Sequence, residues 1–308
     1  MAIPVLIDTD MGIDDAVAIA LALAAVELDV VGMVSVGGNV ALEQATRNIG
    51  RLLSGLGLTK WPAVGRGLDQ DGQLSDAAHV FNADGLGGVD LVEPADFAPE
   101  DYRTVYERAI RTHGEALCIV AIGPLTNLAA VMREMPEVLA RVGRIIVMGG
   151  AVWCRGNMTR WAEFNFYRDP EAAAAMLASG LPITVVPLDV TQQVAIDDSH
   201  VAHLARSGTR AGPLLARMIR WPLDNHHAEG SGRFLVHDAL AVGVLLWPEM
   251  FLQARMALEV TTGGEQVGRS RPAVARDRKR QLGVVTAVNT VDFLENLIET
   301  LCDEKFVV

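Results

Sequence analysis

Short apolar runs alternate along this chain with longer stretches that have helical periodicity. The apolar runs are rich in β-branched residues, as expected of strands buried on both faces of a sheet. They predict strands at Ile3–Ile7, Val30–Val36, Leu117–Ile122, Arg144–Met148 and Ile183–Leu188. The stretches between them predict helices at Asp14–Glu27, Leu42–Leu53, Asp101–Thr112, Leu125–Glu134 and Pro170–Leu177. This alternation predicts an α/β fold with an open, mainly parallel twisted sheet flanked by helices. Because such sheets bind ligands at the carboxyl ends of their strands, polar residues directly after strands are the candidates for chemistry.

Composition narrows the classes of function. The chain has 308 residues and a net charge of −12, which argues against a surface for nucleic acid or for an anionic membrane. Its longest apolar run, residues 16–26, is well short of the roughly 18 residues that a membrane span needs. The N-terminus lacks the basic segment of a signal peptide, and the three cysteines are widely spaced. We therefore expect a cytoplasmic protein with reduced thiols.

No repeat or Pro/Ser-rich linker marks a domain boundary, so residues 1–308 are predicted to form a single domain. Residues 66–98 are rich in Gly and Asp and are predicted to leave the sheet. Residues 206–233 are predicted to form helices and loops. Residues 269–280 contain six basic residues without interleaved aromatics, which favours a solvated hairpin or loop over a nucleic-acid patch.

Four carboxylates fall within eight residues between the first strand and the first helix: Asp8, Asp10, Asp14 and Asp15. One or two of them could cap the helix, but capping does not explain four. Crowded carboxylates repel one another unless a cation lies among them, and hard cations such as Ca²⁺ take six to eight oxygen ligands. The loop therefore predicts a metal site. An EF-hand is excluded, because its pattern started at Asp8 would place Gly12 and Ile19 at ligand positions.

The nine residues from Asp8 to Ala16 read Asp-x-Asp-x-Gly-x-Asp-Asp-Ala, and further motifs follow in order. They are Gly38-Asn39, Gly123-Pro-Leu-Thr126-Asn, Met148-Gly-Gly, Gly156-Asn157, Glu163-Phe-Asn165, Asp169-Pro-Glu-Ala-Ala and His237-Asp238. This series resembles the nucleoside hydrolases, the family of the inosine-uridine preferring nucleoside N-ribohydrolases. The resemblance runs from residue 3 to about residue 300, and it implies a Rossmann-like nucleoside hydrolase fold.

The resemblance also implies a reaction and a set of site residues. The reaction is Ca²⁺-dependent hydrolysis of the N-glycosidic bond of ribonucleosides to free base and ribose, with Asp10 as general base on the metal-held water. The implied metal ligands are Asp10, Asp15, the main-chain carbonyl of Thr126, and Asp238. The implied ribose-binding residues are Asp14, Asn39, Asn157, Glu163 and Asn165. Asp8 is expected to lie behind the ligands. The implied partners are a small nucleoside and further copies of the chain, as a homodimer or homotetramer.

His237 is the candidate acid or hydrogen-bond partner for the departing base, although a histidine at a helix start can also simply pack beside Asp238. The sequence departs from the family at Met11, where proline is common, and at Asn82, where histidine is common. It does not decide between purine and pyrimidine substrates, and it gives no role to His226, His227 or Cys154. Two alternatives remain: a nucleoside phosphorylase, which would need an anion site beside the sugar, and a non-catalytic calcium-dependent nucleoside- or sugar-binding protein.

Overall fold

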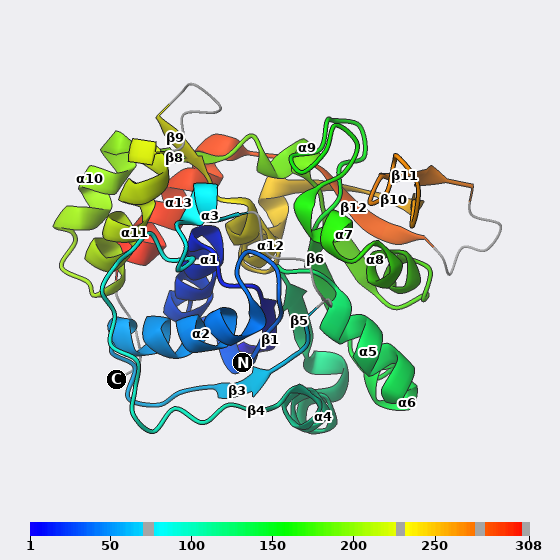
Figure 1. The fold of residues 1–308 in the computed structure, drawn as a ribbon, viewed down its shortest axis with the longest axis horizontal. Coiled ribbons are helices and arrows are strands. Elements are labelled where there is room, and N and C mark those ends of the chain that lie inside the picture. Colours follow the sequence, from blue (N-terminus) through cyan, green and yellow to red (C-terminus); the bar gives the residue numbers. More distant parts are fainter. Residues whose placement is uncertain (70–76, 226–231, 275–280, 304–308) are drawn as a thin grey trace.

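A computed structural model describes residues 1–69, 77–225, 232–274 and 281–303. Within these residues a ten-stranded sheet runs through the molecule in the order β11-β10-β12-β7-β6-β5-β1-β2-β3-β4 (Figure 1). Its strands are β1 Ile3–Thr9, β2 Leu28–Ser35, β3 Ala63–Arg66, β4 Glu100–Asp101, β5 Cys118–Ala121, β6 Arg144–Met148, β7 Ile183–Val186, β10 Phe251–Val260, β11 Ser270–Ala273 and β12 Leu282–Val288. The strands from β12 to β4 pair in parallel, whereas β10 pairs antiparallel with β12 and β11. The predicted fold class, an open and mainly parallel sheet, is confirmed.

Helices cover both faces of this sheet (Figure 1). One face carries α1 Ile13–Ala24, α2 Leu42–Leu56, α11 Ala211–Asn225, α12 His237–Leu246 and α13 Thr290–Cys302. The other face carries α4 Tyr102–His113, α5 Thr126–Glu134, α6 Pro136–Leu139 and α8 Pro170–Leu177. Alternate residues of one strand enter opposite cores: Val5 and Ile7 pack under α1, while Leu6 packs under α4. Burial on both faces explains why the predicted strands are so uniformly apolar.

The remaining elements surround the sheet. They are α3 Ala78–Phe81, α7 Phe164–Arg168, α9 Leu188–Thr191 and α10 Asp198–Arg206, together with the two-stranded sheet of β8 Ala195–Asp197 and β9 Arg233–Leu235. The predicted excursion from the sheet after residue 66 is confirmed for its described part, since the chain returns to the sheet only at β4. Within the run predicted as a solvated hairpin or loop, β11 pairs antiparallel with the preceding strand β10, and residues 275–280 lie outside the described residues.

Two predicted boundaries shift for physical reasons. The strand predicted over Ile183–Leu188 ends at Val186, because Pro187 lacks an amide hydrogen and Leu188 already begins α9. The helix predicted over Asp14–Glu27 ends at Ala24, after which Ala25 has an extended backbone and the chain turns into β2. In the region predicted as helices and loops, β9 begins at Arg233, and residues 226–231 lie outside the described residues.

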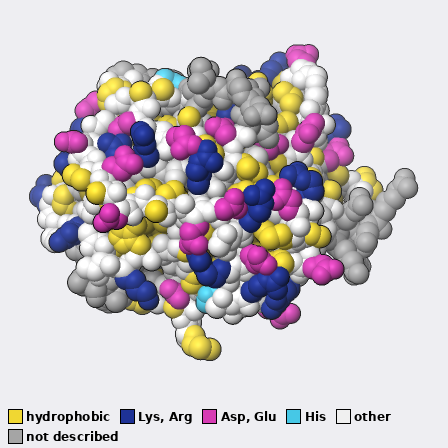
Figure 2. All heavy atoms as spheres, turned by 60° about the horizontal axis from the view of Figure 1, so that its bottom comes forward, with side chains coloured by type: hydrophobic (Ala, Val, Ile, Leu, Met, Phe, Trp, Pro, Cys, Tyr) yellow, Lys and Arg dark blue, Asp and Glu magenta, His cyan; other side chains and the backbone are white. Residues whose placement is uncertain are grey.

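Acidic and basic side chains are interspersed on the face drawn in Figure 2, with apolar side chains between them. Several of the surface charges form exposed ion pairs, such as Arg108 with Glu100 and Arg271 with Glu259. Exposed pairs of this kind contribute about 0–1 kcal/mol each. Among the described residues, no helix has the length and apolar character that a membrane crossing requires.

Candidate active site

The predicted acidic loop lies where the strand order reverses. The chain passes from β1 outward through β2, β3 and β4, and then returns to β5 on the other side of β1. The carboxyl ends of β1 and β5 therefore border the crevice in which open α/β sheets bind ligands. Asp10 follows β1, and the loop after β5 comes close to it, because a Cβ added at Gly123 would lie 3.1 Å from the Asp10 amide nitrogen.

Asp10 is held by the residue that follows the second strand. Its Oδ2 accepts a hydrogen bond from the Asn39 amide nitrogen at 2.7 Å, and its Oδ1 accepts one from Asn39 Nδ2 at 3.1 Å. The close approach requires glycine at position 38, where a Cβ would collide with Asp10 Oδ2. Burial, followed by the nearby Asp15 charge, raises the pKa of Asp10 well above its usual range. The structure thus joins two predicted site residues, Asp10 and Asn39.

Asp15 is fixed in the first turn of α1 by three donors. Thr9 Oγ1 donates to its Oδ1 at 2.5 Å, while the Gly12 amide and Asn39 Nδ2 donate to its Oδ2 at 2.8 and 3.1 Å. Burial still raises the pKa of Asp15. Asn39 therefore bridges Asp10 and Asp15, and Thr9 is a supporting residue that the sequence patterns did not single out.

Asp14, Asp15 and Asp238 form one buried cluster. Each offers one carboxylate oxygen, and these three oxygens lie within 4.8 Å of one another. Asp238 comes from the first turn of α12, which packs against α1. Burial and the neighbouring carboxylates raise the pKa of Asp14 to about 8 and that of Asp238 well above its usual range. Among the described residues, buried Asp14 Oδ1 has no hydrogen-bond partner.

This donor set suits a hard divalent cation. Carboxylates forced together in a buried site must be protonated or share a cation, and carboxylate oxygens are the ligands that Ca²⁺ and Mg²⁺ prefer. The N-terminal turns of α1 and α12 add a favourable dipole for the charged carboxylates. The cluster therefore fits the metal that the sequence predicts. Met11, at the tip of the loop, has a φ of 56°, a left-handed conformation that proline cannot adopt.

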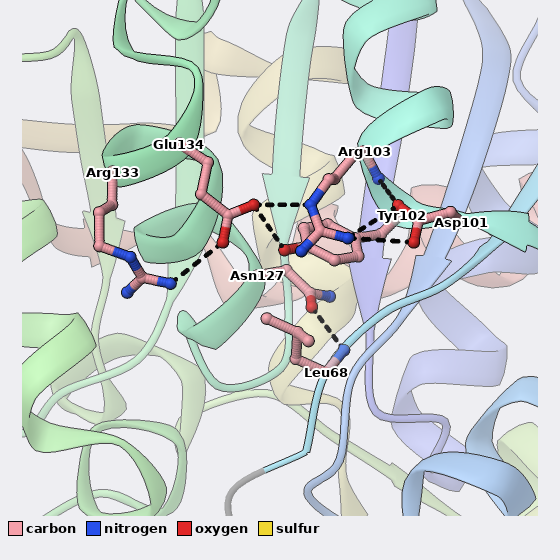
Figure 3. Close-up of polar contacts among 7 residues, drawn as sticks. All are labelled: Leu68, Asp101, Tyr102, Arg103, Asn127, Arg133 and Glu134. Atoms are coloured by element: carbon pink, nitrogen blue, oxygen red, sulfur yellow. Dashed lines mark hydrogen bonds and ion pairs between the residues drawn. The ribbon is translucent and has the colours of Figure 1, made fainter.

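Asp8 faces away from this cluster, toward the other core. Its Oδ2 accepts hydrogen bonds from Tyr106 Oη at 2.6 Å and from Asn127 Nδ2 at 2.9 Å. Burial outweighs these two bonds and raises the pKa of Asp8 to about 7. Asn127 also donates to the Ser35 carbonyl, and its Oδ1 accepts from the Leu68 amide (Figure 3). Asn127 thus ties together the ends of β1, β2 and β3.

Glu134, at the end of α5, links this helix to α4 (Figure 3). It accepts hydrogen bonds from Arg103 and from Tyr102, which both lie on α4. Arg103 Nε donates to Glu134 Oε2 at 2.6 Å. The helix that carries Asn127 is therefore tied to the helix that carries Tyr106. Tyr106 gave no sequence signal, because an aromatic residue on an amphipathic helix is usually core.

Thr126 begins α5 directly after the loop beside Asp10. Its hydroxyl donates to Asp169 Oδ2 at 2.7 Å, and Asp169 Oδ1 in turn caps α8 through the Ala172 amide at 2.9 Å. This contact fixes the Thr126 side chain at the predicted edge of the sheet. The role of its main-chain carbonyl as a metal ligand remains a prediction.

The three predicted ribose-binding residues between β6 and the first turn of α7 all have structural contacts. Glu163 accepts hydrogen bonds from the amides of Gly150, Asn165 and Phe166 at 2.8–3.1 Å, which caps α7. Asn165 Nδ2 donates to the carbonyls of Ile122 and Met148, at the ends of β5 and β6. Asn157 is exposed, and its Oδ1 accepts from the Phe164 amide. Their contact with a ribose remains a prediction.

His237 begins α12 immediately before Asp238. Its Nδ1 lies 2.8 Å from Thr191 Oγ1, at the end of α9. Burial lowers the pKa of His237 to about 4, so the imidazole is neutral near pH 7. A neutral ring favours the predicted role of hydrogen-bond partner over that of acid. Thr191 is a second supporting residue that the sequence patterns did not indicate.

Comparison with known proteins decides the family. The model of the inosine-uridine preferring nucleoside hydrolases matches residues 5–295. The chain belongs to this nucleoside hydrolase family. The family predicted from the sequence is therefore confirmed, and with it the enzyme class and the fold.

Individual relatives of this nucleoside hydrolase differ in their named substrates. It is 37% identical over 271 residues to the pyrimidine-specific ribonucleoside hydrolase RihA of Escherichia coli, a match that covers 86% of each chain. A purine-preferring ribonucleoside hydrolase from Gardnerella vaginalis has a TM-score of 0.90 at 28% identity, covering 97% of this chain and 98% of the other. A plant nucleoside hydrolase has the same TM-score at 30% identity, covering 98% and 100%.

The two positions at which the sequence departs from the family, Met11 and Asn82, lie in the acidic loop and next to a residue that contacts it. Phe81 at the end of α3 covers Gly12, since a Cβ at Gly12 would lie 3.0 Å from the Phe81 ring. Asn82 follows with a φ of 67°, and its Oδ1 accepts from the Ala83 amide. The histidines at positions 226 and 227 lie outside the described residues. Cys154 is partly buried, and burial together with Asp189 raises the pKa of its thiol to about 12.

Proposed function

We propose that this nucleoside hydrolase cleaves the N-glycosidic bond of ribonucleosides to free base and ribose, and that the reaction depends on Ca²⁺. The observation that carries the proposal is the buried cluster of Asp14, Asp15 and Asp238, in which Asp14 Oδ1 has no hydrogen-bond partner within the part of the chain that the structure describes. Such a cluster is unstable as bare carboxylates and is suited to a cation.

The proposed ligands are Asp10, Asp15, Asp238 and the Thr126 carbonyl. When bound there, Ca²⁺ would supply ligand positions for ribose hydroxyls and acidify a water beside the anomeric carbon. The chain's own contribution is to keep Asp10 and Asp15 in place, which Asn39 does through hydrogen bonds to both carboxylates.

Asp10 is the proposed general base. Asn39 donates once to each of its oxygens, which orients the carboxylate and leaves lone pairs free. Burial raises the pKa of Asp10 in the protein without metal. The cation proposed beside it would favour the ionised carboxylate, which is the form that accepts a proton.

Asp14, Asn39, Asn157, Glu163 and Asn165 are proposed to bind the ribose hydroxyls. Asp14 is the best supported of them, because its Oδ1 is buried without a partner among the described residues. Glu163 has the least remaining capacity to accept a hydrogen bond from a ribose hydroxyl, because backbone amides already donate to both of its carboxylate oxygens. His237, held by Thr191, is proposed to donate a hydrogen bond to the departing base.

We propose that pyrimidine ribonucleosides are preferred. The identity to the pyrimidine-specific RihA enzymes is 37%, against 28% to the purine-preferring enzyme of Gardnerella vaginalis. The preference is tested by kcat/KM for uridine, cytidine, inosine and adenosine. A higher value for either purine nucleoside than for both pyrimidine nucleosides would reverse this assignment.

One assay separates hydrolysis from its alternatives. The protein is incubated with the four nucleosides with and without phosphate, and the sugar product is identified. Free ribose without phosphate supports the proposal, whereas ribose 1-phosphate formed only with phosphate identifies a phosphorylase. Ligand-induced thermal stabilisation without any product identifies a binding protein. A cytoplasmic location and a homodimer or homotetramer remain predictions, and light scattering after size exclusion tests the second.

A further inference from the structure

Three arginines surround a pocket beside the loop that follows β6. The pocket has a volume of about 600 Å³. Its walls include Trp153, Arg155, Arg160, Trp161, Arg269 and Ser270. Among the described residues, no ion pair involves any of these three arginines. In a chain with a net charge of −12, the pocket is therefore a local concentration of positive charge.

Two of the guanidinium groups share one aromatic ring. The Cζ atoms of Arg160 and Arg269 lie 4.3 and 4.5 Å from the centroid of the Trp161 ring. The ring attracts each cation, but it carries no net charge to offset two of them. Arg269 Nη1 also donates to Gln266 Oε1, which is a neutral acceptor. The nearby Asp189 carboxylate accepts from the backbone amides of Val152 and Trp153, and no ion pair joins a described carboxylate to these guanidinium groups. The arrangement points to an anionic ligand.

The backbone that lines the pocket is held by side-chain hydrogen bonds. Asp189 on α9 accepts hydrogen bonds from the amides of Val152 and Trp153 at 2.8 and 2.7 Å. Ser270 Oγ accepts from the Ala151 amide at 2.9 Å and donates to the Ala151 carbonyl at 3.0 Å. These contacts fix the backbone of residues 151–153, so little ordering of this segment is needed when a ligand binds.

We propose that this pocket binds an organic phosphate with a planar ring, such as a nucleoside 5′-monophosphate. The planar guanidinium fork can donate two parallel hydrogen bonds to one phosphate group. Trp153 lines the same pocket and is 56% exposed, which provides a free aromatic surface for a base. The volume is larger than a bare phosphate needs. None of the three carboxylates of the buried cluster is among the described residues that line this pocket.

Titration calorimetry with uridine 5′-monophosphate tests the proposal, in EDTA so that binding is followed without turnover. We expect one ligand per chain and a Kd that increases with ionic strength. Arg160→Gln and Arg269→Gln should each raise the Kd by about tenfold or more. Arg160→Lys should have a smaller effect, because it keeps the charge and loses the fork. Arg206→Gln, an exposed arginine on α10, is the matched control and should leave the Kd unchanged.

Two further measurements identify the ligand and the site. Trp153→Ala alters an exposed side chain, so it should leave the fold intact and weaken the nucleotide while inorganic phosphate binds as before. Three results would overturn the proposal: an unchanged Kd in both arginine-to-glutamine variants, inorganic phosphate binding as tightly as the nucleotide, or loss of binding in Asp10→Asn. None of these readouts needs hydrolysis, so the outcome is independent of the proposed function.

Discussion

The side chains of the site divide into those proposed to do the chemistry and those that hold them. Asp10 and His237 belong to the first group, and Asn39 and Thr191 to the second. The roles of the first group were implied by the family resemblance, which the acidic loop and the His-Asp pair help to carry. Thr191 could not be found in this way, because it lies 46 residues from His237 and threonine is common at helix ends. Tyr106, 98 residues from Asp8, was missed for the same reason.

Asp10 and His237 are predicted to differ in their dependence on the leaving group. Asp10→Asn keeps the shape and one ligand oxygen, so it should lower kcat by about 10²–10⁴ on every substrate through loss of the base. His237→Ala should lower kcat strongly on uridine and inosine and little on p-nitrophenyl riboside, whose leaving group needs no donor. Steady-state kinetics of both variants on the three substrates checks this. An equal loss on the nitrophenyl substrate would assign His237 a positioning role instead.

Thr191 is predicted to act through His237. Thr191→Val keeps the volume and removes the hydroxyl that contacts Nδ1, so the imidazole loses its fixed orientation. We expect kcat on uridine to decrease by about tenfold, the equivalent of one lost hydrogen bond, with little change on p-nitrophenyl riboside. Thr191→Ser keeps the hydroxyl and serves as control. The same loss on both substrates would show that Thr191 supports only the local packing.

Helices and strands with a clear hydrophobic pattern were predicted well. The positions of their ends were predicted less well, because each end depends on particular residues. Asp101 was predicted inside its helix, but it is the N-cap of α4, where its carboxylate accepts from the Arg103 amide at 2.9 Å. The strand β9 was not predicted, because its three residues are shorter than any periodic pattern. Short elements depend on their partners, here β8, more than on their own sequence.

The cap of α10 is predicted to depend on pH. Asp197 accepts from Ser199 and from His200, and these contacts lower the pKa of its carboxyl to about 2. Because this pKa is lower in the folded than in the unfolded protein, the ionised carboxylate stabilises the fold above about pH 4. This stabilisation is lost as the pH decreases toward 2. Asp197→Ala should therefore lower the free energy of unfolding by about 1 kcal/mol at pH 7. The difference should disappear near pH 2, as followed by denaturant titration, and a difference that is constant with pH would exclude the charge as its cause.

For the whole molecule, the alternation of strands and helices was enough to predict the parallel sheet. It did not predict the antiparallel extension by β10 and β11, because a strand's direction depends on connections that a local pattern does not contain. Nor did it predict that the acidic loop lies at the point where the strand order reverses. We infer that residues 1–308 form one domain, which predicts a single calorimetric transition whose van't Hoff and measured enthalpies agree.

Stability without metal is predicted to decrease as the pH rises. Burial raises the folded-state pKa of Asp8 and Asp14 to about 7 and about 8, above the ordinary value of 3.8. A raised pKa stabilises the fold fully below about pH 4, and the stabilisation is lost as the pH increases toward 8. The Tm in EDTA should therefore decrease between these values, and Ca²⁺ should restore it most at pH 8. A Tm in EDTA that increases over this range would contradict the assignment of the buried carboxylates.

The central claim, that the acidic cluster holds the Ca²⁺ on which hydrolysis depends, is tested most directly by ribose release from uridine. The protein is stripped of metal, its metal content is verified, and the rate is measured in phosphate-free buffer before and after Ca²⁺ is added. The account predicts negligible release without metal and recovery with Ca²⁺, to a higher rate than with Zn²⁺, because every proposed ligand is an oxygen. Full activity in the verified metal-free protein would contradict it.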